Sequence, residues 1–207
     1  MSRRLMLLNV SGGGILPSGY RRVNCITIPE GGVINTKLPP TLTSEINITA
    51  RINSTLNENR AIWYSRGILP SDFQYVNAFG NDTGFTYQFG HPYIQSVGTK
   101  DNSKHTFYTK GMEFVVDNSI TAYLPSMPDT PSNRPILLAA RQNQSGTGYE
   151  QFSNLTVWSY KHNSDTQRTQ TLVPCERLSD NAFGMYDIEA DAFIGNSRTG
   201  VITEGVE

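Results

Sequence analysis

Residues 172–205, LVPCERLSDNAFGMYDIEADAFIGNSRTGVITEG, decide the fold of this chain. Two short segments in this stretch, residues 183–186 and 192–194, combine aromatic and apolar side chains as strands do. Three carboxylates at two-residue spacing, Asp187, Glu189 and Asp191, lie between them. Two strands this close in sequence need a turn between them, so we expect a hairpin that has residues 189–191 at its bend.

The rest of the chain also has the pattern of short strands. Ile46, Ile48, Ala50 and Ile52 alternate strictly with polar residues, which is typical of a strand with one buried face. No ten-residue stretch shows the 3.6-residue period of a helix. Asp117 and Asn118 indicate a tight turn between two strands. The further strands that we expect cover residues 23–28, 61–64, 85–89, 105–108, 114–116, 120–123, 136–140 and 155–158.

Composition points to one globular domain. The chain has 207 residues, of which 37% are hydrophobic and 17% charged, so it can form a core. The formal net charge of −1 gives no basic surface for nucleic acid, and no apolar run is long enough to cross a membrane. Neither an internal repeat nor a change of composition divides residues 15–207, so we expect a single all-β domain there.

Residues 1–14 form a separate arm. A short basic and apolar segment ends in a glycine hinge at Gly12, Gly13 and Gly14. The apolar run is too short for a usual signal peptide, so we expect the segment to be retained. Such an arm is disordered, lies on its own domain, or docks on a partner. We favour docking, through Arg3, Arg4, Leu5, Met6, Leu7 and Leu8.

Cysteine and histidine offer little chemistry. Cys25 and Cys175 stand among apolar neighbours, and two cysteines do not make a disulfide framework, so we expect a buried and reduced pair. His91, His105 and His162 are far apart and lie in no metal-ligand spacing. We therefore expect no catalytic residues, no metal and no cofactor.

Several motifs in order resemble one family. They are residues 16–20 (LPSGY), 85–90 (FTYQFG), 136–140 (ILLAA), 172–175 (LVPC), 183–187 (FGMYD) and 192–196 (AFIGN). This order is similar to that of the concanavalin A-like lectin/glucanase domains, in the laminin-G-like form found in bacteriophage head-fibre and tail-fibre proteins and in bacterial surface proteins. The resemblance covers residues 16–205 and implies a two-sheet antiparallel jelly-roll sandwich.

The resemblance also implies a role. It suggests a non-catalytic structural or attachment protein on the surface of a bacteriophage virion, as a head fibre, capsid decoration or tail-associated fibre. The arm would anchor it to capsid or tail proteins, and the domain, as a homo-oligomer with a trimer favoured, would face outward. A bacterial cell-surface carbohydrate-binding module is an alternative. A fold alone does not fix a function, so pure scaffold and glycan-binding roles both stay open.

A glycoside hydrolase is the other alternative, because glucanases of this superfamily carry alternating carboxylates on a strand. Retaining glycosidases need two carboxyl groups about 5–5.5 Å apart across the scissile bond. Glucanase runs open with Glu, whereas this run opens with Asp187, and the flanking aromatic segments place Glu189 and Asp191 in a turn. We therefore expect no enzyme, and expect Asp187 to cap the turn.

Sugar binding would use an aromatic platform beside amide or carboxylate groups on loops. The candidate residues for such a site, which compete with ordinary roles in strands or interfaces, are Trp63, Tyr64, Tyr75, Asn77, Asn81, Asp82, Tyr93 and Tyr149. Trp158 is a further possible platform, because it stands on the face opposite to Leu155 and Val157.

Overall fold

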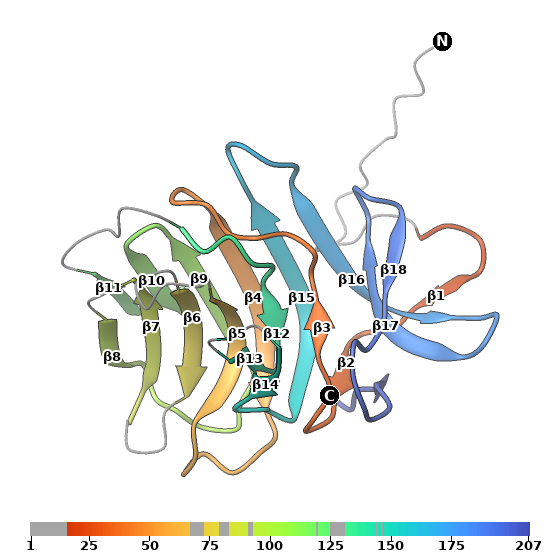
Figure 1. Ribbon diagram of the computed structural model, residues 1–207. Coiled ribbons are helices and arrows are strands. Elements are labelled where there is room, and N and C mark those ends of the chain that lie inside the picture. Colours follow the sequence, from red (N-terminus) through yellow and green to blue (C-terminus); the bar gives the residue numbers. More distant parts are fainter. Residues whose placement is uncertain are drawn as a thin grey trace.

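The computed structural model describes residues 16–66, 73–78, 83–90, 93–118, 120–124, 131–143, 145 and 147–207. Residues 1–15 lie outside this set, so the arm and its anchor residues stay predictions. Within the described residues the chain is all-β, and two antiparallel sheets form a sandwich (Figure 1). The predicted all-β jelly-roll sandwich is confirmed. The described residues contain no helix that could cross a bilayer.

The larger sheet forms one layer. Its main path runs through β11 (Ile120–Tyr123), β10 (Glu113–Val116), β9 (His105–Lys110), β4 (Glu45–Ile52), β15 (Leu155–Asn163), β16 (Gln170–Arg177), β17 (Ala182–Asp187) and β18 (Ala192–Ile194). Three short strands join it: β1 (Tyr20–Arg22) pairs with β16, β2 (Ile26–Ile28) pairs with β15, and β19 (Thr203–Glu204) pairs with β2.

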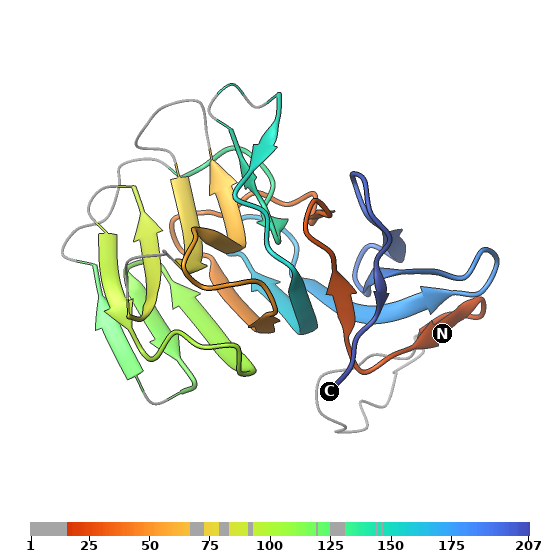
Figure 2. The same ribbon diagram turned by 90° about the horizontal axis from the view of Figure 1, so that it is seen from below.

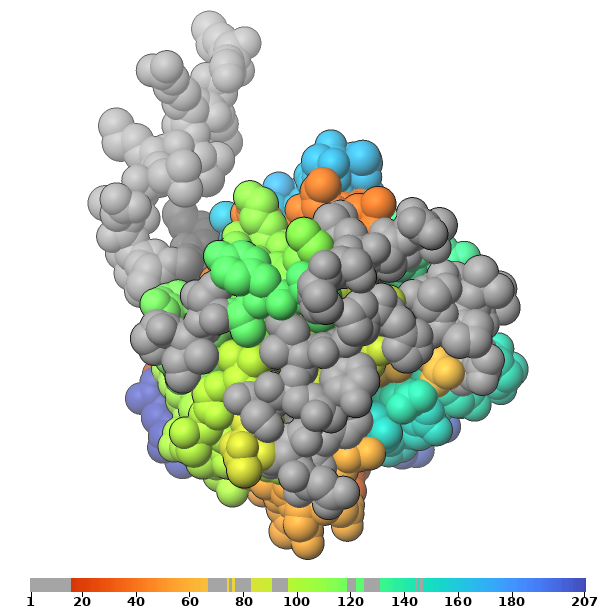
Figure 3. Space-filling view, turned by 90° about the vertical axis from the view of Figure 1, so that its left-hand side faces the viewer, coloured from red at the N-terminus to blue at the C-terminus, as the bar shows by residue number. Residues whose placement is uncertain are grey.

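The smaller sheet forms the second layer. Its order is β3 (Ile34–Asn35), β12 (Leu137–Leu138), β5 (Arg60–Arg66), β6 (Phe73–Ala78), β7 (Phe85–Phe89) and β8 (Tyr93–Val97). A separate ribbon joins β13 (Arg141–Gln142) and β14 (Tyr149–Glu150). In Figures 1 and 2 the smaller sheet lies over β9, β4 and β15, while β16, β17, β18 and β1 extend beyond it. The edge with β11 and β8 faces the viewer in Figure 3.

Strand β15 organises the larger sheet. It has nine residues, and all of them except Trp158 pair with β4 along one edge. On the other edge, residues 155–157 pair with β2 and residues 160–162 pair with β16. A β-bulge between Val157 and Ser159 adds one residue to β15 relative to β4. The extra residue reverses the alternation, so Leu155 and Val157 before it and Tyr160 and His162 after it are all buried.

The core lies between the two sheets. Ile46, Ile48, Ala50 and Ile52 of β4 are buried, as their alternation predicts. The tight turn predicted at Asp117 and Asn118 is also confirmed, because both residues have a φ of 55° and β10 pairs with β11 around them. The smaller sheet contributes to the core mainly through Ile62, Trp63, Val76, Phe85, Tyr87 and Phe89.

One prediction about strands needs correction, and one strand runs through a proline. Residues 136–140 are fully buried, but only Leu137 and Leu138 form a strand, because Ala139 has a φ of 67°, outside the extended region. Strand β16 continues through Pro174, whose carbonyl accepts a hydrogen bond from Val23 N at 3.2 Å. The missing N–H of proline thus does not end this strand.

The closing hairpin, β17–β18, depends on a glycine. A Cβ atom at Gly184 would lie 2.5 Å from the carbonyl oxygen of Ile194 and 2.7 Å from the ring of Phe193. Without a side chain there, the Phe193 ring packs over β17, stacks on Tyr20 with 5.9 Å between ring centroids, and lies 4.5 Å from the Arg177 guanidinium. The FG pair in the closing motif therefore reflects close packing within the hairpin.

Candidate functional site

The predicted sugar platforms in β5 are buried. Trp63 is 0% exposed and Tyr64 1% exposed. Trp63 packs into the core beside Tyr87, and Tyr64 lies beneath the Arg141 guanidinium at 5.3 Å. Strand β5 is covered on its outer face as well, where Arg141 lies over the Tyr64 ring and Ser65 donates a hydrogen bond to Arg134 O. Neither ring presents a face to a ligand, which corrects this part of the prediction.

The other predicted site residues are only partly placed. Tyr149 is half-buried, and its ring lies 5.1 Å from the Arg198 guanidinium. Tyr75 and Asn77 belong to β6 and Tyr93 to β8, but their side chains lie outside the described set. Asn81, Asp82 and His91 lie outside the described residues, as do the predicted anchor residues Arg3, Arg4, Leu5, Met6, Leu7 and Leu8. Sugar binding by this set is therefore not supported as a single site.

The carboxylates of the closing hairpin occupy a turn. Asp187 pairs with Ala192 across the hairpin, and residues 188–191 form the bend. The Ala190 N–H donates to Asp187 Oδ1 at 3.0 Å. The predicted hairpin, with Asp187 capping its turn, is confirmed.

Each of the three carboxylates has an internal partner. Glu189 accepts hydrogen bonds from the backbone N–H and the hydroxyl of Thr171, at 2.5 and 2.7 Å. Asp191 accepts one from the Tyr186 hydroxyl. Burial and this hydrogen bond raise the pKa of Tyr186 to about 12. These three carboxyl groups are thus each engaged with a different partner within or beside the hairpin.

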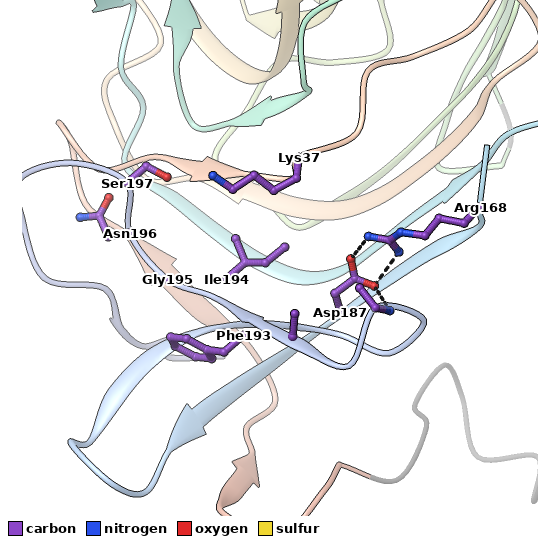
Figure 4. Close-up of a pocket in the computed structure, with 10 residues that line it drawn as sticks. Lys37, Arg168, Asp187, Phe193, Ile194, Gly195, Asn196 and Ser197 are labelled. Carbon is purple, nitrogen blue, oxygen red and sulfur yellow. Dashed lines mark hydrogen bonds and ion pairs between the residues drawn. The ribbon is translucent and has the colours of Figure 1, made fainter. Parts of the chain in front are cut away.

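Asp187 is the centre of a buried polar cluster. The Arg168 guanidinium donates to both of its oxygens, at 2.9 and 2.5 Å (Figure 4). Gln170 Nε2 also donates to Asp187 Oδ2, at 2.6 Å. The carboxylate is only 1% exposed. Burial favours its neutral form, but the hydrogen bonds from Arg168 and Gln170 outweigh burial and hold the pKa of Asp187 below its ordinary value. The Arg168–Asp187 ion pair therefore stabilises the fold.

The same cluster extends into β15. His162 and Gln170 are cross-strand neighbours, and both side chains are fully buried. His162 Nε2 lies 2.7 Å from Ser44 Oγ, and Gln170 Nε2 also donates to Thr36 O at 2.7 Å. Burial, helped by the positive charge of Arg168, lowers the pKa of His162 to about 4. Sequence reasoning missed this cluster, because only the bulge turns Tyr160 and His162 inward.

Trp158 lies on the outer face of the larger sheet. Strand alternation with Leu155 and Val157 directs it away from the core, it lies at the bulge, and it is half-buried. The Lys104 ammonium lies 4.6 Å from the ring centroid and the Arg51 guanidinium 5.5 Å. Both distances suit cation–π attraction. The prediction that Trp158 stands opposite to Leu155 and Val157 is confirmed.

Polar side chains surround Trp158 on this face. Two cross-strand hydroxyl pairs, Thr49–Thr106 at 3.2 Å and Thr27–Thr156 at 3.0 Å, lie on neighbouring strands. Asn53 Nδ2 donates to Thr156 at 2.8 Å and Asn53 Oδ1 accepts from Arg51 Nε at 2.9 Å. We call Trp158, Arg51, Lys104 and these threonine and asparagine side chains the tryptophan face. It combines an aromatic ring, two cations and hydrogen-bonding groups, of which Thr156 is fully buried next to Gly205 near the end of the chain.

The thiols and histidines show no metal site within the described residues. Cys25 and Cys175 are buried and free, as predicted, and burial raises the pKa of Cys175 to about 12. His105 lies between two carboxylates, Asp117 at 2.8 Å and Asp101 at 3.0 Å.

No family model matches this chain, and no curated protein matches it. Among solved structures, it is similar to the CBM40 of the Ruminococcus gnavus IT-sialidase, with a TM-score of 0.46. The identity is 11% for the CBM40 alone and 12% for the CBM40 bound to alpha2,3 sialyllactose. Each match covers 67% of this chain and 90% or 89% of the other.

Domains LG4-5 of the mouse laminin alpha1 chain are also similar, with a TM-score of 0.47 and 11% identity, over 89% of this chain and 50% of the laminin chain. Laminin LG domains are the form of fold that the sequence resembles. At such identities the likeness is one of fold and says nothing about a ligand.

The buried His162 makes stability depend on pH. In the unfolded chain it takes up a proton near pH 6.5, whereas in the folded protein it does so only near pH 4. The contribution of neutral His162 to the free energy of unfolding is complete above pH 6.5. It is lost as the pH falls toward 4, and the loss amounts to about 3 kcal/mol. Asp187 and Glu45, whose pKa values lie below 3.8 and 4.5, stay ionised over most of this range.

Urea unfolding between pH 7 and 4.5 measures this loss. The variant His162→Gln, whose amide can still bond Ser44, should show a flatter pH profile than the wild type. Equal profiles would contradict the assignment to His162.

Asp187 and Glu189 should differ sharply on substitution. Asp187→Asn leaves Arg168 without its anion and should lower the free energy of unfolding by about 3 kcal/mol. Glu189→Gln keeps a hydrogen-bond acceptor at an exposed site and should cost less than about 1 kcal/mol. Thermal and urea unfolding measure both. If the wild type cleaved a polysaccharide and Glu189→Gln abolished that cleavage, the hydrolase alternative would be restored.

Proposed function

We propose that this domain is a non-catalytic glycan-binding module that attaches a bacteriophage particle to the surface of its host. The observation that carries the glycan-binding part is the tryptophan face. An indole ring packs against the C–H face of a sugar ring, and nearby hydroxyl and amide groups bond its hydroxyls. The outer face of a sheet, built on strands, holds such groups in fixed positions.

The cations on this face suit a glycan with acidic groups. Lys104 contacts only the Trp158 ring among the described interactions, and Arg51 bonds Asn53 and the carbonyl of Val206, which carries no full charge. The nearest carboxylate on the same face of β4, Glu45, is paired with Lys110 at 2.5 Å. Neither cation forms an ion pair with a carboxylate among the described residues, although Glu204 and Glu207 act on the same Cys25 thiol as Arg51 and Lys104.

The virion part of the proposal rests on the family resemblance and on residues 1–14. A short basic and apolar arm ending in Gly12, Gly13 and Gly14 suits docking on a capsid or tail protein. The domain would then face outward on the virion surface, as a homotrimer or another homo-oligomer. The internal use of Asp187, Glu189 and Asp191 supports a module without catalysis.

The tryptophan face is tested by binding to a glycan array that includes neutral and acidic polysaccharides. Trp158→Ala should reduce binding at least about 10-fold, because the ring supplies the contact area, whereas Trp158→Phe should keep most of it. Tyr123→Ala is the matched control, since Tyr123 is a 67% exposed aromatic residue of β11 in the same sheet. Unfolding temperatures should confirm that all variants are folded. Unchanged binding by Trp158→Ala, or no glycan bound by the wild type, would contradict the proposal.

The anchor is tested separately by deleting residues 1–14. The truncated domain should unfold at the same temperature as the full chain but should be missing from purified phage particles. Recovery of the truncated protein on particles would rule out the arm as the anchor, without bearing on glycan binding.

A further inference from the structure

A cavity of about 470 Å³ lies beside the closing hairpin, away from the tryptophan face. Its walls come from the loop after β3, the segment before β16, the end of β17 with the hairpin turn, and β18 with the loop that follows (Figure 4). The volume is within the usual range for small-molecule sites. The lining residues on which the argument depends are Lys37, Arg168, Asp187, Ala192, Ile194 and Ser197.

One wall of the cavity is held rigid by Asn196. Its Oδ1 accepts hydrogen bonds from Val33 N at 2.9 Å and Arg198 N at 3.1 Å. Its Nδ2 donates to the carbonyl oxygens of Thr199 at 3.2 Å and Gly200 at 2.7 Å. Because this one side chain ties the loop after β18 to β3 and to itself, the cavity is preformed and needs little ordering to accept a ligand.

The opposite wall carries Lys37 in an unusual conformation. Its φ is 68°, in the left-handed region that residues other than glycine and asparagine rarely adopt. The Lys37 N–H is held by Asn35 Oδ1 at 2.9 Å. Figure 4 shows the Lys37 side chain extended along the cavity above Ile194 and toward Ser197. Backbone strain of this kind tends to occur where a side chain has a role in binding.

The cavity has an excess of one positive charge. Arg168 and Asp187 neutralise each other at one end. Lys37 is exposed and makes no ion pair with any described residue, so its ammonium is available. The exposed Ser197 hydroxyl is a second hydrogen-bonding group, while Ala192 and Ile194 give an apolar surface between them. These groups match a compact ligand with one anionic group, hydroxyls and a C–H face.

We propose that this cavity binds the carboxylate end of a small acidic sugar, with Lys37 pairing with the carboxylate, Ser197 bonding a hydroxyl, and the ring lying on Ala192 and Ile194. A carboxylate paired with an ammonium forms a charge-assisted hydrogen bond, which is stronger than a neutral one. The site is independent of the tryptophan face, because Asp187 and its partner Gln170 are buried on the inner side of the sheet whose outer side carries Trp158.

The test uses the full chain and three probes: glucuronic acid, glucose as its neutral counterpart, and inorganic phosphate. Titrations followed by ¹H–¹⁵N NMR should show shifts at Lys37 and residues 194–197 with glucuronic acid, at a dissociation constant on the order of 1 mM. Glucose should bind at least about 10-fold more weakly. Binding of glucose as tight as that of glucuronic acid, or binding of phosphate alone, would overturn the proposal.

Variants at Lys37 separate charge from backbone strain. Lys37→Asn suits the left-handed backbone and removes the charge, so it should lower the affinity for glucuronic acid at least about 10-fold. Lys37→Arg keeps the charge and should bind within a few-fold of the wild type. Lys110→Asn, a lysine on β9 paired with Glu45, is the matched control and should not change binding. Trp158→Ala should not change it either, so failure here and failure of the tryptophan face are distinguishable. Full affinity in Lys37→Asn would refute the role of Lys37.

Discussion

The β-bulge in β15 is the constraint on which the buried polar cluster beside the closing hairpin depends. A regular strand paired with β4 would place Tyr160 and His162 on the outer face and Ser159 and Lys161 in the core. One extra residue reverses this order, so apolar residues before the bulge and the Tyr160–His162 pair after it share the inner face. Trp158 faces outward by the regular alternation that precedes the shift in register. A single irregularity thus places the polar cluster on the inner face, while Trp158 keeps its place on the outer one.

The polar cluster in turn fixes the closing hairpin. Gln170 of β16 bonds both Thr36 O, next to Lys37, and Asp187 at the end of β17. Asp187 also holds Arg168 and the turn N–H of Ala190. These bonds join the loop after β3 to the hairpin, and the cavity lies between these two segments. Removing the ion pair would therefore affect cavity shape as well as stability.

Sequence patterns predicted what local periodicity and turn chemistry determine. The alternation in β4, the turn at Asp117 and the hairpin around Asp187 all follow from residues adjacent in sequence. The bulge, the burial of Trp63 and Tyr64, and the cluster around His162 depend on how separate strands pair and pack, which no local pattern reveals. Trp158 was visible as an outward residue, but its cations, Arg51 and Lys104, come from distant segments. The cavity was missed because Lys37 gains importance only through its backbone conformation and its neighbours on β18.

The carboxylates of the closing hairpin are bound by neighbouring side chains, which argues against a catalytic role for them. Acid/base work requires carboxyl groups that are free to exchange a proton with a substrate. Here Asp187, Glu189 and Asp191 accept hydrogen bonds from Arg168, Thr171 and Tyr186 and stabilise the hairpin. The side chains left without an anionic partner at the two sites are cations, Lys37 in the cavity and Lys104 on the tryptophan face. A chain with a net charge of −1 thus presents positive charge at both sites, which favours acidic ligands over neutral ones.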